Sequence, residues 1–419
     1  MRSRPPLPEG PYLVVGLARS GQAAARVLRE RGEVIGCDSG RPQLGRLDGV
    51  ELHLESDGVE LLGRAAALVK SPGVPRQAPV VAAALERGIP VLGELELAWR
   101  LLPNRFIAVT GTNGKTTTVE LLGAMLAAAG LPHAVAGNVG TPLASLVGAL
   151  PRDATVVCET SSFQLEDATA FAPECALLLN LTEDHLDRHG SRAAYAAAKL
   201  SIFARQAETD LAVAPAWLAL LGPARPVRFG APDSDLSLRE GELRWRGEPL
   251  LPAREIRLRG AHNLENAMGA AAAALASGVQ AEAVRVALRG FAGVPHRLEE
   301  VATADGVLYV NDSKATNVDS AVRGIDAFDG GVHVILGGSL KGGGFRGLRD
   351  AVRSRCRACY LIGRAEESLA ADLDGAAPLE RCGTLERAVA GAPRAAPPRA
   401  GGRGSPPRAP GDPSPHNEA

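Results

Sequence analysis

Apolar runs alternate with helical patterns along most of the chain. Residues 12–17 (YLVVGL) are continuously apolar, a turn follows at 18–21, and residues 22–31 place apolar side chains at helical spacing. A second apolar segment at 34–36 leads to Asp38. Continuous apolar runs are typical of strands that a parallel sheet buries on both faces, with a helix as the crossover between them. The segment therefore predicts a βαβ unit with a carboxylate at the end of its second strand.

The same alternation continues in two further blocks. The second block is predicted to have a strand at 105–109 and helices near 115–129, 191–203 and 262–277. The third is predicted to have strands at 307–310, 333–336 and 359–362. Strands that alternate with helices predict an α/β protein, here of three domains with mainly parallel sheets. We place these domains at residues 1–102, 103–294 and 295–392.

Residues 393–419 have a different composition from the rest of the chain. They include eight prolines and four glycines, but no Val, Ile, Leu, Met or aromatic residue. Such a segment cannot bury enough apolar area to offset the entropy lost on ordering. We therefore predict a disordered tail rich in Pro, Gly and Arg.

Charge and cysteine content exclude several classes of protein. The 46 basic and 47 acidic residues give a net charge of −1, which leaves no basic excess for binding nucleic acid. Six cysteines in 419 residues, without a charged and then apolar leader, predict a reducing, cytoplasmic location. No apolar run approaches the roughly 18 residues needed to span a bilayer, so we expect no membrane association.

Lysine is scarce in this arginine-rich chain. Only five of the 46 basic residues are lysines, at positions 70, 115, 199, 314 and 341. A lysine retained against such a bias indicates a position that needs a compact ammonium, or an amine able to lose its proton. Chance in a codon-biased gene remains the alternative for any one of them.

A phosphate-binding loop is the strongest motif. The residues TGTNGKTT at 110–117 lie between an apolar strand and a helix, where backbone N–H groups and a helix N-terminus favour polyphosphate. We expect Lys115 to neutralise phosphate charge and the Thr116 hydroxyl to bind magnesium. The candidate nucleotide-binding residues are Gly111, Thr112, Asn113, Gly114, Lys115, Thr116 and Thr117. The loop predicts a central domain like those of P-loop ATPases, between two Rossmann-like domains.

Further polar clusters follow the predicted strands of the second block. Glu159 ends the strand VVCE and, beside a phosphate loop, is suited to hold magnesium. His185, within NLTEDHLDRH at 180–189, could take a magnesium position or orient a substrate, while helix capping would explain the neighbouring acids. Lys199 has no acid four residues before or after it, so it is either solvated or a neutral amine in a partly buried site.

Other clusters lie near the second domain junction and in the third block. Asn263 and Asn266 share one helix face and could bond a purine or ribose, with capping as the alternative for Asn263. NDSKATN at 311–317 and the glycine-rich loop at 337–344 follow strands of the third block. Because all these clusters lie at strand ends, we expect one cleft between domains.

Two weaker patterns can be explained by a structural role as well as by a functional one. Residues 16–21 approach the dinucleotide fingerprint GxGxxG but have alanine at the second glycine, which favours a nucleotide-sugar site or a plain tight turn. A nicotinamide oxidoreductase would need the intact fingerprint and would leave the phosphate loop unexplained. Cys356 and Cys359 have the spacing of half a zinc site, but no second pair exists, so we predict a structural role.

Taken in order, these motifs resemble the Mur ligases of bacterial cell-wall synthesis over about residues 10 to 390. The resemblance rests on GTNGKTT, ETSSFQLE, NLTEDHLDRH, YAAAKLSIF, GAHNLEN, PHR and NDSKATN. Within the family, ETSSFQLE and NDSKATN are most similar to the members that add D-glutamate. Folylpolyglutamate synthases share the phosphate loop and the lysine but match these two motifs less well.

The resemblance implies an ATP-dependent acid–D-amino-acid ligase of peptidoglycan precursor synthesis. ATP would phosphorylate the carboxylate of UDP-N-acetylmuramoyl-L-alanine, and the amine of D-glutamate would attack the acyl phosphate. Lys115, Thr116 and Glu159 would serve ATP and a first magnesium ion. Lys199 would be carbamylated and would hold a second magnesium ion together with His185. The expected enzyme is a monomer.

The resemblance also implies roles for residues outside the phosphate loop. The substrate residues would be Asn138 and His185 for the muramoyl part, and Ser20, Asp38, Ser39 and Gly73 for the UDP part. The nucleotide residues would be Asn266, Arg297 and Asp312. The residues around the transferred phosphate and D-glutamate would be Lys314, Thr316 and Lys341. The third domain would close over ATP about a hinge at 295–297.

The chain departs from the family pattern in two places. Ser339 stands where the family has aspartate, and residues 393–419 lack the apolar strand and the serine- and phenylalanine-containing loop that help to bind D-glutamate. An alternative is therefore an altered ligase-like protein that binds ATP and the UDP-substrate but has little D-glutamate ligase activity.

Overall fold

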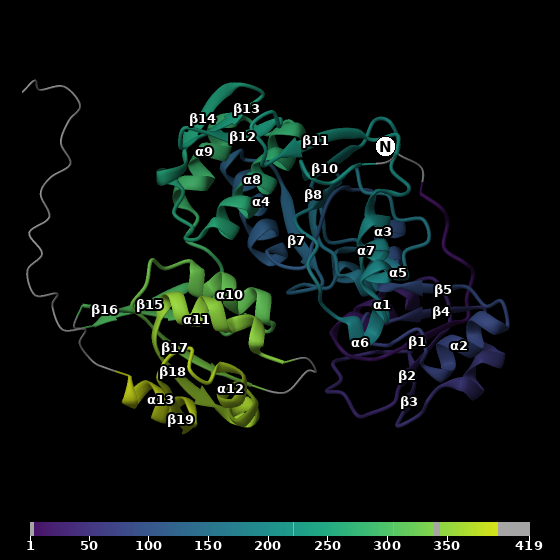
Figure 1. Ribbon diagram of the computed structural model, residues 1–419. Helices are drawn as coiled ribbons and strands as arrows, with labels where there is room; N and C mark the ends of the chain where they lie inside the picture. The colour runs from purple at the N-terminus through teal and green to yellow at the C-terminus, as the bar shows by residue number, and fades with distance from the viewer. Residues whose placement is uncertain (1–3, 221, 305, 339–343, 393–419) are drawn as a thin grey trace, which may run out of the picture.

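The computed structural model describes residues 4–220, 222–304, 306–338 and 344–392, and three α/β regions follow one another in it (Figure 1). A five-stranded sheet comes first, a nine-stranded sheet second, and a two-stranded and a three-stranded sheet last. Most strand pairs are parallel, which confirms the predicted α/β class with mainly parallel sheets. Within these residues, no helix combines the length and the apolar character needed to cross a membrane.

The first sheet has the strand order β3-β2-β1-β4-β5 and is entirely parallel. Its strands are β1 (Tyr12–Val15), β2 (Val34–Asp38), β3 (Glu51–Leu54), β4 (Ala67–Lys70) and β5 (Val91–Gly93). Its helices are α1 (Arg19–Arg29), α2 (Pro79–Glu86) and α3 (Glu94–Leu101). Two separate apolar clusters, one with α1 and one with α2, cover the two faces of the sheet. Helix α1 begins at Arg19, three residues before the predicted start. The predicted turn is shorter than expected, because Ala18 is already the N-cap residue, in an extended conformation.

The second sheet has the strand order β14-β13-β12-β11-β10-β9-β6-β8-β7. Its parallel part consists of β6 (Arg105–Thr110), β7 (His133–Gly137), β8 (Thr155–Glu159), β9 (Cys175–Leu178), β10 (Leu211–Pro215), β11 (Arg225–Phe229) and the start of β12 (Leu236–Arg239). An antiparallel edge follows, made of β12, β13 (Glu242–Trp245) and β14 (Glu248–Pro252). The central strands β6, β8 and β9 are almost wholly buried, as expected for continuous apolar runs.

Helices cover both faces of this central sheet. One face packs against α4 (Lys115–Ala128), α8 (Ala261–Ala276) and α9 (Ala281–Gly290). The other packs against α1, α3 and α5 (Ser162–Glu166), and against the end of α7 (Arg192–Leu200) with the residues that follow it. The short helix α6 (Leu186–His189) precedes α7. Five consecutive alanines at 270–274 are fully buried in α8, where small side chains let the helix lie close to the strands.

The last region differs in one respect from the simple alternation that we predicted. Strands β15 (Glu299–Ala304) and β16 (Val307–Asn311) form an antiparallel pair, separate from the parallel sheet of β17 (Val332–Gly337), β18 (Cys356–Ile362) and β19 (Leu379–Gly383). The helices are α10 (Val318–Asp326), α11 (Arg349–Arg355), α12 (Glu366–Leu373) and α13 (Leu385–Gly391). The predicted strand at 307–310 is present, but a short connection after Ala304 favours a hairpin over a parallel crossover.

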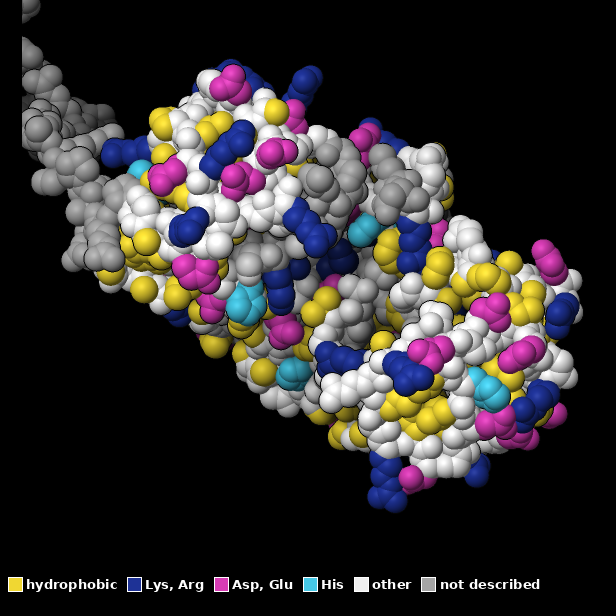
Figure 2. All heavy atoms as spheres, turned by 90° about the horizontal axis from the view of Figure 1, so that it is seen from below, with side chains coloured by type: hydrophobic (Ala, Val, Ile, Leu, Met, Phe, Trp, Pro, Cys, Tyr) yellow, Lys and Arg dark blue, Asp and Glu magenta, His cyan; other side chains and the backbone are white. Residues whose placement is uncertain are grey.

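The strand order places the predicted polar clusters at one edge. Because β9, β6 and β8 are neighbours, the segments that follow their carboxyl ends meet beside the start of α4. The start of α10 lies against this edge, through side-chain contacts described below. Figure 2 shows a hollow in one face of the molecule, with basic side chains near it.

Candidate active site

A tight loop joins β6 to α4 and depends on glycine. Gly114 has a φ of 86°, a left-handed conformation that non-glycine residues rarely adopt. A Cβ atom at this position would lie 2.0 Å from the Asn266 Oδ1 of α8. The loop can therefore pass this close to α8 only with glycine at position 114.

Asn180 holds the phosphate loop in place. Its Oδ1 accepts from the backbone N–H of Asn113 at 2.9 Å, and its Nδ2 donates to the Asn113 carbonyl at 3.0 Å. The backbone carbonyl of Asn180 also accepts from the N–H of Thr112 at 3.1 Å. These contacts fix the loop before any ligand binds, so little ordering entropy remains to be lost on binding.

The ammonium of Lys115 folds back over the loop. Its Nζ donates to the carbonyls of Gly111, at 3.0 Å, and Thr112, at 2.9 Å. Burial lowers the pKa of Lys115, and the nearby carboxylate of Glu159 opposes this effect. The cation is thus placed inside the loop, where a polyphosphate would offer it a stronger partner than two carbonyls.

A carboxylate and a hydroxyl lie together at the end of the loop. The Thr116 hydroxyl donates to the Glu159 Oε2 at 2.8 Å, and the Asn138 Nδ2 donates to its Oε1 at 3.0 Å. Glu159 is only 2% exposed. Oxygen donors of this kind fit magnesium, which is commonly held by one or two protein oxygens, waters and substrate phosphates. Within the described ranges, no group of three or more His, Cys, Asp or Glu side chains could form an all-protein metal cage.

Lys199 is buried beside the same loop. Its Nζ donates to the carbonyl of Gly111 at 2.7 Å, and the residue is 2% exposed. Burial, and secondly the charge of Lys115, lower the pKa of Lys199 to about 6. Of the two alternatives left open by the sequence, the structure favours a buried amine that is largely uncharged near neutral pH over a solvated lysine.

Tyr195 contacts both Lys199 and the loop. The Lys199 Nζ lies 4.7 Å from the centre of the Tyr195 ring, whose hydroxyl donates to the Thr112 Oγ1 at 3.1 Å. Burial raises the pKa of Tyr195 to about 12, so the hydroxyl keeps its proton. The ring and the loop together enclose the lysine amine.

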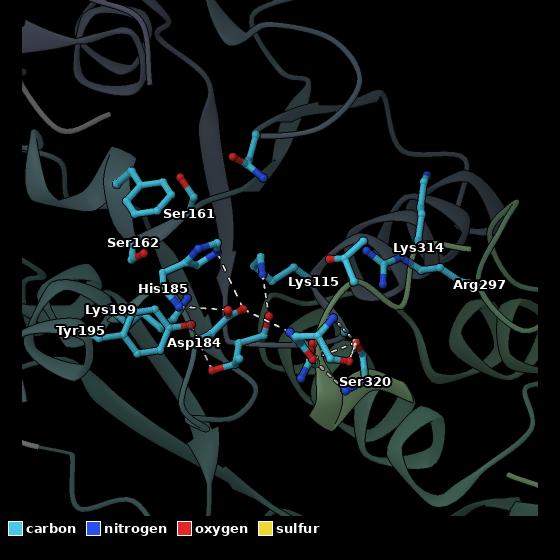
Figure 3. Close-up of a pocket in the computed structure, with 17 residues that line it drawn as sticks. Lys115, Ser161, Ser162, Asp184, His185, Tyr195, Lys199, Arg297, Lys314 and Ser320 are labelled. Atoms are coloured by element: carbon cyan, nitrogen blue, oxygen red, sulfur yellow. Dashed lines mark hydrogen bonds and ion pairs between the residues drawn. The ribbon is translucent and has the colours of Figure 1, made fainter. Parts of the chain in front are cut away.

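A cavity of about 300 Å³ lies beside these groups (Figure 3). Thr116 and Glu159 are not among the residues that line it. The predicted site residues that line it from the central region are Thr112, Asn113, Gly114, Lys115, Asn138, His185 and Lys199. Those that line it from the third region are Arg297, Lys314 and Thr316. The cavity therefore joins residues that are up to about 200 positions apart in the sequence, as expected for a cleft between domains.

His185 has an unusual backbone conformation beside the cavity. Its φ is 51°, in the left-handed region, and its ring meets Phe163 edge to face with a centroid distance of 4.9 Å. Such conformations cost about 1–3 kcal/mol and are common at functional sites. The imidazole is thereby held at the cavity wall.

Polar contacts join the third region to the phosphate loop. Asp319 of α10 accepts from the Asn113 Nδ2 at 2.5 Å and from the Thr182 hydroxyl at 3.3 Å. Asn317 donates to Asp184 at 3.1 Å. The guanidinium of Arg297 also donates to the hydroxyl of Thr116, at 3.3 Å. The two regions therefore meet directly at the loop.

Some predicted residues lie elsewhere. Asn266 contacts Gly114 and donates to Asn263, so it supports the loop from the side of α8. Asp312 accepts from the backbone N–H of Leu298, and burial raises its pKa. Neither Asn266 nor Asp312 is among the residues that line the cavity.

The residues predicted to bind UDP belong to the first sheet. Asp38 accepts from the backbone N–H groups of Leu17, at 2.6 Å, and Gly40, at 2.9 Å. The other three lie at the same edge, where β1, β2 and β4 end: Ser20, Ser39 and Gly73. None of these four lines the described cavity, so the UDP prediction concerns a separate surface.

Several predictions fall outside the described residues. Lys341, Ser339 and the tail at 393–419 are among the positions that the structure does not describe. Two residues that contact the loop were not predicted from the sequence. The hydroxyl of Tyr195 and the carboxylate of Asp319 reach the loop from 83 and 206 residues away. Only the proximity of Tyr195 to Lys199 and of Asp319 to NDSKATN could have drawn attention to them.

The fold and the loop together define a nucleotide-binding α/β protein of three regions. Comparison with family models gives two matches in this chain. The model described as "Mur ligase MurD-like, N-terminal domain" matches residues 11–93, and "Mur ligase middle domain" matches residues 109–221.

Curated relatives share most of their length with this chain. One from Acidobacterium capsulatum is 43% identical over 406 residues, which cover 90% of this chain and 87% of the relative. One from Desulfatibacillum aliphaticivorans is 38% identical and covers 92% and 90%. Both are named UDP-N-acetylmuramoylalanine–D-glutamate ligase. The chain therefore belongs to the Mur ligase family.

Solved structures agree on the fold. MurF ligase from Thermotoga maritima in complex with ADP has a TM-score of 0.58 at 19% identity, covering 90% of this chain and 86% of that one. UDP-N-acetylmuramate-alanine ligase MurC from the same organism also has a TM-score of 0.58, at 18% identity, covering 89% and 90%. The three-domain α/β fold of these ligases is thus the fold of this protein.

Proposed function

We propose that this protein is an ATP-dependent amide ligase that joins D-glutamate to UDP-N-acetylmuramoyl-L-alanine in peptidoglycan precursor synthesis. The curated relatives at 38–43% identity supply the identity of the substrates. The observation that carries the chemistry is the convergence of Lys115, Lys199 and the Thr116–Glu159 pair on one preformed loop.

Amide formation from a carboxylate needs an activated leaving group. ATP would transfer its γ-phosphoryl group to the carboxylate of L-alanine, which gives an acyl phosphate and ADP. The amine of D-glutamate would then attack the acyl carbon, form the amide bond and release phosphate and a proton. Phosphoryl transfer between anions depends on cations and positioning. Lys115 would neutralise the polyphosphate, while Thr116 and Glu159 would hold a magnesium ion that screens its charge.

Lys199 is proposed to carry a carbamate. An uncharged amine reacts with carbon dioxide to give a carbamate anion and a proton, and a pKa of about 6 leaves the amine uncharged at neutral pH. This reaction converts the uncharged amine beside Lys115 into an anionic oxygen donor. The carbamate and His185 would then hold a second magnesium ion, which would neutralise charge near the substrate carboxylate.

The domains are proposed to divide the substrates among them. Residues 1–102 would bind UDP through Ser20, Asp38, Ser39 and Gly73, and residues 103–294 would bind ATP. Residues 295–392 would bind D-glutamate and the transferred phosphate through Lys314, Thr316 and Lys341. Arg297, Asn266 and Asp312 would support the nucleotide, and Asn138 the muramoyl part. The positive φ values at His296 and Leu298 support a hinge at 295–297. We further propose a cytoplasmic monomer.

Phosphate release from ATP tests the proposal. It should be measured with both acceptors, with each alone and with neither. We expect rapid release only when UDP-N-acetylmuramoyl-L-alanine and D-glutamate are both present, with L-glutamate as the matched control. Release that is indifferent to D-glutamate would contradict the proposed activity and would support the altered ligase instead.

A further inference from the structure

An acid, an imidazole and a hydroxyl form a chain along the wall of the cavity. The Glu166 Oε1 lies 3.0 Å from the Nδ1 of His189, and the His189 Nε2 lies 3.0 Å from the Ser162 Oγ. Glu166 and Ser162 belong to α5, whereas His189 ends α6. Ser162 lines the cavity with Asn138 and His185. Glu166, His189 and Ser162 belong neither to the phosphate loop nor to the magnesium ligands proposed above.

The imidazole of His189 is held rigidly. Phe163 stacks on it with a centroid distance of 5.3 Å and an interplanar angle of 11°. Tyr195 meets it at 5.2 Å and 66°, and the side chain of His189 is 0% exposed. Both aromatic neighbours also line the cavity. A ring enclosed in this way keeps one orientation, so each nitrogen keeps its own partner.

The contact with Glu166 favours one position for the proton of the His189 ring. The Glu166 contact is electrostatic rather than an aligned hydrogen bond, but a carboxylate at 3.0 Å still favours a proton on Nδ1. In the tautomer with its proton on Nδ1, the ring has an acceptor at Nε2, and the Ser162 hydroxyl donates to it. With its only proton engaged, the Ser162 oxygen can offer only lone pairs to the cavity.

We propose that Ser162 is a substrate-contacting acceptor for an amide N–H, and that His189 is the positioning residue that fixes this role. The inference rests on the proposed function, in which the lactoyl–L-alanine amide lies next to the reacting carboxylate. A fixed acceptor for this N–H would orient the carboxylate toward the phosphate loop. A site built to accept one N–H discriminates against an analogue that lacks it.

An ester analogue of the substrate tests the contact directly. In UDP-N-acetylmuramoyl-L-lactate, oxygen replaces the amide N–H and the terminal carboxylate is retained. For the wild-type protein we expect the kcat/KM of the ester to be about tenfold or more below that of the amide. In Ser162→Ala this preference should largely disappear, while the KM for ATP stays close to the wild-type value. Ser145→Ala, at an exposed serine, is the matched control.

His189 is tested by substitution and by its own spectrum. His189→Phe should lose the amide preference as Ser162→Ala does, and His189→Gln, whose carbonyl can accept the serine proton, should restore part of it. Thermal unfolding of each variant reports whether the fold is intact. The imidazole nitrogen-15 shifts of His189 should show a protonated Nδ1 and an unprotonated Nε2 in the wild-type protein.

The outcomes separate this inference from the proposed function. If the wild-type protein forms the amide product but Ser162→Ala keeps the full preference for amide over ester, the inference is wrong and the function stands. A protonated Nε2 would overturn it as well, whatever the activity. Absence of any product from the wild-type protein would remove the proposed function itself.

Discussion

Single residues around the phosphate loop differ in how far the sequence predicts them. The sequence indicates Lys115, Thr116 and Glu159 as candidates because their proposed chemistry depends on a local motif or on a strand end. The scarcity of lysine drew attention to Lys199, but its contact with the Gly111 carbonyl depends on folding across 88 residues. Neither its burial nor its lowered pKa could be predicted from the segment YAAAKLSIF.

Removal of the Lys199 amine should abolish activity in a reversible manner. We expect Lys199→Ala to lose at least about a hundredfold in rate, because electrostatic groups in an active site contribute on this scale. Added formate or acetate should restore part of the rate by supplying the missing carboxylate. Phosphate release measured with equal concentrations of chloride is the control. A fully active alanine variant would contradict the proposed carbamate.

Ser162 and His189 show why other site residues stay hidden in a sequence. Each is an ordinary residue of a polar segment, and only the packing of α5 against α6 and α7 joins them to Glu166. Asp319 is similar, since its partners on the loop cannot be predicted from the segment that contains it.

At the scale of elements, the continuous apolar runs predicted the buried parallel strands well. Strand β6 and helix α4 follow the predicted bounds closely, because the loop between them has a strong local signature. The pairing of β15 with β16 was not predicted, since the apolar pattern of a short strand does not specify its neighbour.

Gly114 connects β6 to α4 in a conformation that only glycine tolerates well. We expect Gly114→Ala to weaken ATP binding by about tenfold or more, because both the strain and the clash with Asn266 displace the loop. Gly130→Ala is the matched control, since Gly130 also has a positive φ but nothing lies within 4 Å of the added atom. Calorimetric titration with ATP would measure both. Equal affinities in the two variants would show that the loop does not bind the nucleotide.

Glu94 begins α3 and is buried against the central region. Its Oε1 accepts from the backbone N–H of Ala144 at 2.7 Å, and burial raises its pKa to about 7. In the unfolded protein the Glu94 carboxyl ionises near pH 4.5. Between pH 4.5 and about 7 the folded state therefore binds one proton that the unfolded state has lost, and the protein loses stability as pH rises through this range.

Glu94→Gln should therefore stabilise the protein only at the higher pH. We expect a gain of up to about 3 kcal/mol near pH 8 and little change near pH 5. Thermal unfolding at the two pH values measures this difference, with the exposed Glu120→Gln as control. A gain of equal size at both would show that the ionisation of Glu94 is not its cause.

At the scale of the whole molecule, the third region is held against the loop by a few polar contacts. Asp319 accepts from Asn113 and Thr182, and Arg323 on the same helix donates to the same Asp319 oxygen at 3.1 Å. The sequence predicted three α/β regions and a cleft between them. The sequence could not predict how closely the third region lies to the loop. That distance depends on contacts between the surfaces of folded regions, which the pattern of one segment does not show.

Loss of the Asp319 carboxylate should loosen this arrangement. We expect Asp319→Ala to have a larger radius of gyration than the wild-type protein in X-ray scattering without nucleotide, since the contacts to the central region are lost. Asp326→Ala is the control, because Asp326 is exposed and contacts Arg355 within the third region. An unchanged radius would show that other contacts hold the region in place.

The central claim is that the cavity transfers a phosphoryl group to the carboxylate of the UDP-linked substrate before the amide forms. Transfer of oxygen-18 tests this most directly, with both carboxylate oxygens of UDP-N-acetylmuramoyl-L-alanine labelled. Because the acyl phosphate releases one carboxylate oxygen with the phosphoryl group, mass spectrometry should find one oxygen-18 in each phosphate and one fewer in the amide product. Unlabelled phosphate alongside the amide would contradict the account.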